Sequence, residues 1–161
     1  MKFRFVALGI SAPVLLSSLI LTGCHAYAKL YPIEGPLSKL SPPPLFNAKV
    51  AGGPITGYFS AVISDHENVS CKLTKYAWNK SSAYPGTFDI KHAWNAVYGD
   101  KFFEGHILGA STAYYWCDAK GDKGTTIHMA MQVDMAKDES RSQGVKGVVE
   151  DDKDNIYKVA F

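Results

Sequence analysis

Excess charge of one sign is the most obvious thing that this sequence lacks. Its 161 residues carry 17 Lys and Arg against 15 Asp and Glu, so the formal net charge is only +2 at pH 7. The lysines are scattered among aspartates, whereas binding to the phosphates of a nucleic acid needs a concentrated basic surface. The sequence therefore indicates no nucleic-acid partner.

Local motifs of catalysis are lacking as well. His66-Glu67 begins like the His-Glu-x-x-His motif of zinc proteases, but Ser70 occupies the position of the second histidine. Neither a Gly-x-Ser-x-Gly elbow nor a Ser-x-x-Lys motif occurs after residue 24. The local sequence therefore predicts neither a serine nucleophile nor this zinc site.

Scattered polar residues offer the alternative of a site that is assembled only by folding. The candidates are His92, His106 and His128, together with Asp89 or Glu104. Their spacing is not diagnostic of a set of metal ligands, so we expect no metal and no cofactor. A small hydrolase built from His92, His106 and Glu104 stays open as the alternative to a non-enzymatic protein.

Cysteine is scarce, with three in the chain, and the first follows an export signal. Lys2 and Arg4 form a basic start, and an uncharged apolar stretch runs from Phe5 to Leu21. Leu21-Thr22-Gly23-Cys24 then matches the lipobox pattern. This N-terminus resembles the signal peptides of bacterial lipoproteins, which are lipidated on the cysteine and cleaved before it. The resemblance implies a signal peptide at 1–23, a lipid on Cys24 and a membrane as partner.

An uncleaved transmembrane anchor is the competing interpretation of the same stretch. Its length is near the lower limit for crossing a bilayer, and it contains Pro13 and lacks a stop-transfer flank, which favours cleavage.

Aspartate after the lipidated cysteine retains enteric-type lipoproteins in the inner membrane, and here that position is His25. The resemblance therefore implies the outer membrane, with the domain facing the periplasm or the cell surface. Loss of Lys2 and Arg4 leaves 15 basic and 15 acidic side chains.

Lipidation of the first cysteine leaves an even pair, Cys71 and Cys117. In an exported protein such a pair predicts a disulfide. It would close a loop of about 46 residues and, in the chain-entropy model, stabilise the fold by roughly 4 kcal/mol. Two buried thiols are the alternative.

Proline is concentrated between the lipid site and the first expected strand. Tyr31-Pro32, Gly35-Pro36 and Pro42-Pro43-Pro44 favour extended geometry and remove backbone donors. We therefore expect residues 24–46 to form a Pro-rich tether, although its last few residues could lie on the domain. Residues 47–161 are enough for one small domain with its own core.

Alternation with a period of two is the dominant pattern in that domain. Within Thr125–Met135, Ile127, Met129 and Met131 fall on one side and His128 and Gln132 on the other, which predicts a half-buried strand. Five further strands are expected. They are 55–64, a strand carrying Cys71 and Tyr76, 111–119, 145–150 and 156–161.

One segment has helical spacing instead. Ile90, Ala93, Trp94 and Val97 recur at i, i+3, i+4 and i+7, with Thr87 or Asp89 as a cap and Gly99 at the end. The expected fold is mainly β, a small antiparallel sheet, sandwich or barrel-like domain with one short helix at about 88–98. The helix should cover an open face or end of the sheet.

Asp151-Asp152-Lys153-Asp154-Asn155 gathers oxygen donors as a calcium loop does. It lacks the central glycine and the later glutamate of such a loop, and Asp and Asn are also preferred in turns. We therefore predict a hairpin turn at this position.

Aromatic residues are dense in the middle of the chain, where 11 of the 20 Phe, Tyr and Trp lie between Tyr76 and Trp116. Rings that stack on a sugar or line an apolar pocket would account for this density. The candidates for ligand binding are Trp78, Trp94, Tyr98 and Trp116. Filling of the core around the disulfide is the favoured alternative, since the spacing puts several rings on faces expected to be buried.

The part after the signal also resembles small, uncharacterised envelope lipoproteins of proteobacteria. The residues that carry this resemblance are 31–37, 98–109 and 154–161. They are typical of turns and core positions, and the resemblance implies no catalytic residue. We therefore expect a non-enzymatic envelope lipoprotein that acts as a structural, assembly or binding module, with an envelope protein or a glycan as partner. A small envelope hydrolase is the alternative.

Overall fold

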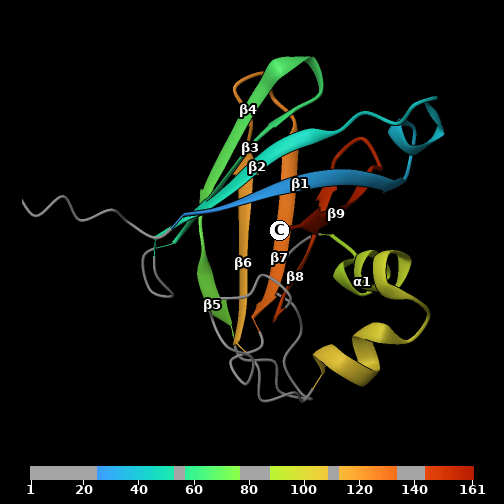
Figure 1. Cartoon of the computed structure of the whole chain (residues 1–161), viewed down its shortest axis with the longest axis vertical. Coiled ribbons are helices and arrows are strands. Elements are labelled where there is room, and N and C mark those ends of the chain that lie inside the picture. The colour runs from blue at the N-terminus through green and yellow to red at the C-terminus, as the bar shows by residue number, and fades with distance from the viewer. Residues whose placement is uncertain (1–24, 53–56, 77–87, 109–112, 134–143) are drawn as a thin grey trace, which may run out of the picture.

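A computed structural model describes residues 25–52, 57–76, 88–108, 113–133 and 144–161. Nine antiparallel strands form one nearly closed, barrel-like sheet in the order β4-β3-β2-β1-β9-β8-β7-β6-β5 (Figure 1). The strands are β1 (His25–Glu34), β2 (Phe46–Ala51), β3 (Tyr58–Ile63), β4 (Glu67–Lys72), β5 (Thr74–Tyr76), β6 (Ala113–Lys120), β7 (Thr126–Val133), β8 (Val145–Asp151) and β9 (Ile156–Ala160). The helical elements are η1 (Leu37–Lys39), η2 (Ser64–His66), α1 (Ile90–Tyr98) and the π-helix η3 (Phe103–Ile107). The prediction of a mainly β fold with one short α-helix is confirmed.

Two features bring the sheet close to a closed barrel. Consecutive strands pair in an up-and-down order, and β9 returns to pair with β1. On the opposite side β4 pairs with β3. Strand β5, which follows β4 directly in the chain, pairs with β6 instead. Between them the backbone N–H of Leu73 donates to the carbonyl of Gly57 at 2.8 Å. The predicted disulfide is present at this change of partner and joins Cys71 of β4 to Cys117 of β6.

The inner face of the sheet is filled with side chains. Ile127 and Met129 of β7 lie there against Phe59 of β3 and Tyr157 of β9, all of them fully buried. Barrels of about eight strands have an interior just wide enough for such filling. Burial of these apolar groups is the main stabilising contribution to the barrel.

The prediction of a half-buried strand at 125–135 is wrong for the part of it that the structure describes. The inward side chains alternate as expected, but the outward His128, Ala130 and Gln132 are also buried. The physical reason is a second cluster on the outside of the sheet, where Trp94 of α1 and Ile107 of η3 pack near Ala130 and Val148. Strand β7 therefore has the alternating sequence of a half-buried strand, although both of its faces are covered.

Helix α1 forms where the apolar spacing predicts it. Ile90, Ala93 and Trp94 are buried, and the Asp89 carboxylate caps the first turn by accepting from the backbone N–H of His92 at 3.0 Å. Gly99 ends the helix with a φ of 109°, a conformation that side chains with a Cβ disfavour. In Figure 1 the helix lies outside the sheet, and it contacts mainly β8 and β9, with further contacts to β1 and η3. It covers one outer face, as predicted.

The segment predicted to be a tether is part of the barrel. Strand β1 occupies residues 25–34, where it pairs with β2 on one side and with β9 on the other. Pro32 is tolerated because the β1–β9 register shifts between it and Glu34, and prolines without an N–H fit at such bulges. The predicted signal peptide at 1–23 and the predicted lipid site at Cys24 lie outside the described residues.

The turn predicted at Asp151–Asn155 is confirmed. The Asp151 carboxylate accepts from the backbone N–H groups of Lys153 and Asn155, both at 2.9 Å, and from the hydroxyl of Tyr157 at 2.7 Å. The amide oxygen of Asn155 in turn accepts from the backbone N–H of Leu37 at 2.9 Å. This network ties the β8–β9 turn to the segment that follows β1.

Candidate binding face on the barrel

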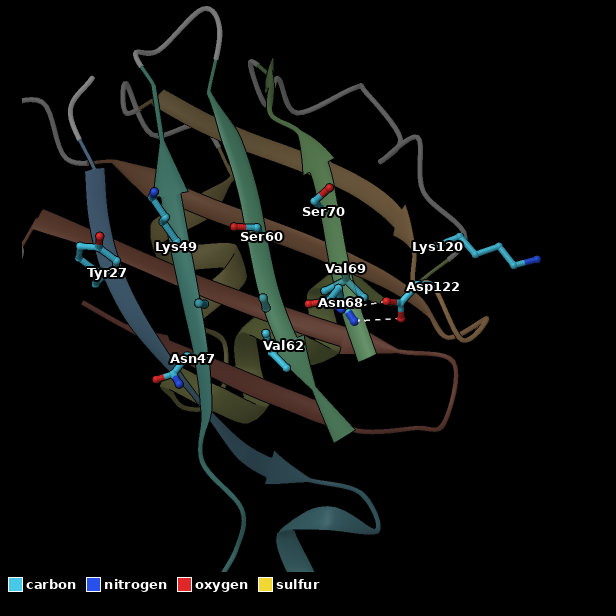
Figure 2. A pocket seen from close by; sticks show the side chains of 12 residues that line it. Tyr27, Asn47, Lys49, Ser60, Val62, Asn68, Val69, Ser70, Lys120 and Asp122 are labelled. Atoms are coloured by element: carbon cyan, nitrogen blue, oxygen red, sulfur yellow. Dashed lines mark hydrogen bonds between the residues drawn. The ribbon is translucent and has the colours of Figure 1, made fainter. Parts of the chain in front are cut away.

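One outer face of the sheet carries none of the helices in the described residues. It is formed by β1 to β4, whose side chains alternate between the core and the outside. Figure 2 shows this face, with Tyr27, Lys49 and Ser60 on three neighbouring strands and Ser70 on the fourth. Two adjoining hollows lie on it, and we call them together the outer groove.

The first hollow has a volume of about 510 Å³. It extends from Tyr27 on β1 across the strands to Asp122 in the β6–β7 turn. Between these ends its polar lining includes Asn47, Ser60 and Asn68, so most of the polar groups are uncharged amides and hydroxyls. Such groups both donate and accept hydrogen bonds, as the hydroxyls of a sugar do.

The second hollow has a volume of about 520 Å³ and lies toward β9. It shares Tyr27 and Asn47 with the first and continues to Tyr31 and Phe161. Tyr27 therefore stands between the two hollows, and its side chain is 73% exposed. An exposed ring with a hollow beside it presents a flat apolar surface to a ligand.

Strand register places the groove residues in two rows. Tyr27 lies opposite Lys49, which lies opposite Ser60, which lies opposite Ser70. In the next row Lys29 is paired with Asn47. Because paired residues share a face of the sheet, these side chains form a continuous polar surface beside the tyrosine.

Hydrogen bonds fix the far wall of the groove. The Asp122 carboxylate accepts from the backbone N–H of Asn68 at 3.0 Å and from its side-chain amide at 2.9 Å (Figure 2). These bonds from Asn68 lower the pKa of Asp122, which stays ionised at neutral pH. At the other end the ammonium of Lys49 lies 5.8 Å from the centroid of the Tyr27 ring. Lys29, Lys49 and Lys120 against one aspartate give the outer groove a positive balance.

Of the aromatic residues singled out from sequence, Trp94, Tyr98 and Trp116 do not lie on this groove. Trp94 is only 1% exposed and stacks on Tyr98 and Phe102, with centroid distances of 5.4 and 5.9 Å. The hydroxyl of Tyr98 donates to the Gly147 carbonyl at 3.2 Å. These rings belong to the apolar cluster on the outside of the sheet and not to the core around the disulfide, and Tyr98 and Phe102 are only partly buried in it. Trp78 lies outside the described residues.

Trp116 and His128 lie together on the outer side of β6 and β7. Their ring centroids are 6.0 Å apart, and Phe88 lies 5.5 Å from the same histidine. The Nδ1 of His128 bonds the Asp118 carboxylate. Burial lowers the pKa of His128 to about 4, so its imidazole is neutral at pH 7. Since this side chain is 0% exposed, it is placed for packing rather than for contact with a substrate.

The residues of the alternative hydrolase are bonded to different partners. His92 bonds the Glu34 carboxylate at 3.0 Å, and this hydrogen bond raises its pKa. Glu104 forms an ion pair with Lys91, whereas His106 stacks on Phe102. All three candidates are exposed, and neither hollow of the outer groove includes them. The described geometry does not bring them together.

The described ranges of the chain contain neither a cluster of metal ligands nor a helix suited to a membrane. Within these ranges no group of three or more His, Cys, Asp or Glu side chains is arranged to hold a metal ion. No helix in the same ranges has both the length and the apolar character needed to cross a membrane. Comparisons with family models, with curated proteins and with solved structures found no match.

The outer groove was not predicted from the sequence, because its central ring, Tyr27, lies in the segment interpreted as a tether. A usable pattern was present in Tyr27-Ala28-Lys29-Leu30-Tyr31, where Ala28 and Leu30 are buried and the other three residues are exposed. This alternation is typical of a strand. The neighbouring prolines concealed it.

Proposed function

We propose that the protein is a non-enzymatic envelope lipoprotein that binds a glycan chain in its outer groove. The observation that carries this proposal is the ring of Tyr27, exposed between two hollows whose polar lining is mainly Asn, Ser and Lys. The apolar C–H face of a sugar ring packs on an aromatic face, and its hydroxyls bond to amides and hydroxyls at the sides.

Charge narrows the class of glycan. Lys29, Lys49 and Lys120 exceed the single Asp122 on the groove, which favours a chain that carries carboxylates or phosphates. The groove is open and lies along the surface, so an extended chain fits it better than a small enclosed ligand. A lipid on Cys24 would hold the domain in the envelope, where such polymers occur.

Cosedimentation with purified peptidoglycan sacculi tests the binding, with an uncharged polysaccharide as the comparison. Replacing Tyr27→Ala should weaken binding about tenfold, because the loss of a stacked ring costs about 1.4 kcal/mol. Tyr58→Ala is the matched control, since Tyr58 is 53% exposed on β3 but lines neither hollow. Equal binding by wild type and Y27A, or equal losses in Y27A and Y58A, would contradict a site at the outer groove.

A further inference from the structure

The distance between the lipid site and the folded domain is the starting point, and the inference rests on the proposed lipidation of Cys24. Strand β1 begins at His25, the next residue. Successive Cα atoms are about 3.8 Å apart, so no spacer separates the anchor from the barrel. The first residue of β1 is already held, because His25 is paired with Ala51 of β2.

The register extends this constraint across four strands. His25 lies opposite Ala51, Ala51 opposite Tyr58, and Tyr58 opposite Lys72. We call these four residues the anchor row. In Figure 1 the start of β1 lies at the left of the molecule, where β2 and β4 also end.

We propose that the barrel rests directly on the membrane, with the anchor row in the layer of phosphate headgroups. The bilayer is the occupant that fits this row because the acylated residue must itself lie at the membrane surface. Tyr58 is 53% exposed and presents an apolar ring with a polar tip, a composition suited to the interface. The exposed ammonium of Lys72 matches the charge of phosphate headgroups, and the anchor row contains no acidic residue.

The same geometry fixes the height of the outer groove. Tyr27 lies two residues beyond His25 and Lys29 four, and a strand rises about 3.4 Å per residue. The two rows of the groove therefore lie within about 14 Å of the anchor row along β1. A chain bound there is held close to the membrane surface.

Site-specific labelling of the mature, acylated protein in vesicles tests this orientation. Once Cys24 is acylated and Cys71 is bonded to Cys117, an introduced cysteine is the reactive thiol in the chain. Tyr58→Cys reports on the anchor row, and Lys153→Cys, in the exposed β8–β9 turn, is the matched control. Each variant is labelled with an environment-sensitive fluorophore and reconstituted with headgroup spin-labelled lipid.

Strong quenching at position 58 with little at position 153 is the expected result. Equal quenching at the two positions, or stronger quenching at 153, would overturn the orientation. Lys72→Glu should reduce quenching at 58 in vesicles containing phosphatidylglycerol, whereas Lys153→Glu should not. Unchanged quenching in K72E would overturn the headgroup contact. Intact mass before reconstitution separates the two proposals, since an unmodified Cys24 contradicts the lipid anchor itself.

Discussion

At the residue scale, a buried carboxylate holds one end of the barrel. Glu67 is 2% exposed at the start of β4, and it accepts from the backbone N–H groups of Lys123 at 3.1 Å and Thr125 at 2.8 Å and from the Thr125 hydroxyl. Gly121 is required beside it, because a Cβ at that position would collide with the Glu67 carboxylate. Three donors thus tie β4 to the β6–β7 turn.

Glu67→Gln should lower the free energy of unfolding by about 2 kcal/mol. The NH₂ group of the glutamine would face the N–H and hydroxyl donors that now bond the carboxylate. Burial raises the pKa of Glu67, but the hydrogen bonds from Thr125 and Lys123 outweigh it, so the pKa is below its usual value. The stabilisation is therefore present above the ordinary value of 4.5 and is lost as the pH falls through the lower pKa of the folded state.

Urea denaturation of wild type and variant from neutral pH down to about pH 3 measures both effects. The exposed Glu104, paired with Lys91, supplies the control Glu104→Gln, which should leave stability nearly unchanged because exposed ion pairs contribute little. Similar acid profiles for E67Q and wild type would contradict the assigned role of the carboxylate.

At the element scale, a single cap sets the start of α1. Asp89→Ala removes the acceptor for the backbone N–H of His92 and should lower the free energy of unfolding by about 1 kcal/mol. Chemical denaturation checks the value, and Asp89→Asn, which keeps an acceptor oxygen, should recover most of it. Equal losses in the two variants would point to charge rather than to capping.

The disulfide acts at the change of strand partner. With Cys71 and Cys117 separated by 46 residues, replacing both by alanine should lower the free energy of unfolding by about 4 kcal/mol. The measurement is denaturation of the double variant beside oxidised wild type. Reduced wild type is the control, since it should lose a similar amount, and a double variant as stable as oxidised wild type would refute the prediction.

Sequence patterns predicted elements whose apolar period was undisturbed. The spacing of Ile90, Ala93 and Trp94 placed α1, and the alternation from Ile127 to Met131 placed β7 and its inner face. Sequence patterns failed where tertiary contacts determine the structure. A proline at a bulge disguised strand β1, and the outer face of β7 is covered by a helix that is distant in sequence. The outer groove was missed because the disguised strand β1 carries its central ring, Tyr27. The register of four strands, which assembles the rest of the groove, is also not visible in the sequence.

At the scale of the whole molecule, acid should weaken the fold in two successive ranges of pH that overlap slightly. Burial lowers the pKa of His128 from an ordinary 6.5 to about 4, so the unfolded chain takes up a proton there before the folded chain does. Stability from this group is complete above pH 6.5 and is lost as the pH falls to about 4. The shift corresponds to roughly 3 kcal/mol. Most of this stability is lost at a higher pH than the contribution of Glu67, which is lost below 4.5.

His128→Gln should therefore flatten the dependence of the unfolding free energy on pH between about 6.5 and 4, besides destabilising the protein. Urea denaturation at closely spaced pH values measures this slope. The variant His66→Gln, at an exposed histidine, should keep the wild-type slope. A wild-type slope in H128Q would contradict the assignment.

Pairing of β1 with β9 gives the molecule a late step in assembly. Before residues 156–160 have been synthesised, β1 has β2 on one side and an open edge on the other. Contacts between strands so distant in sequence form slowly, because a long loop must close first. An open edge is a template for pairing with another chain. The incomplete chain therefore needs protection at β1, and premature truncation before β9 should favour aggregation.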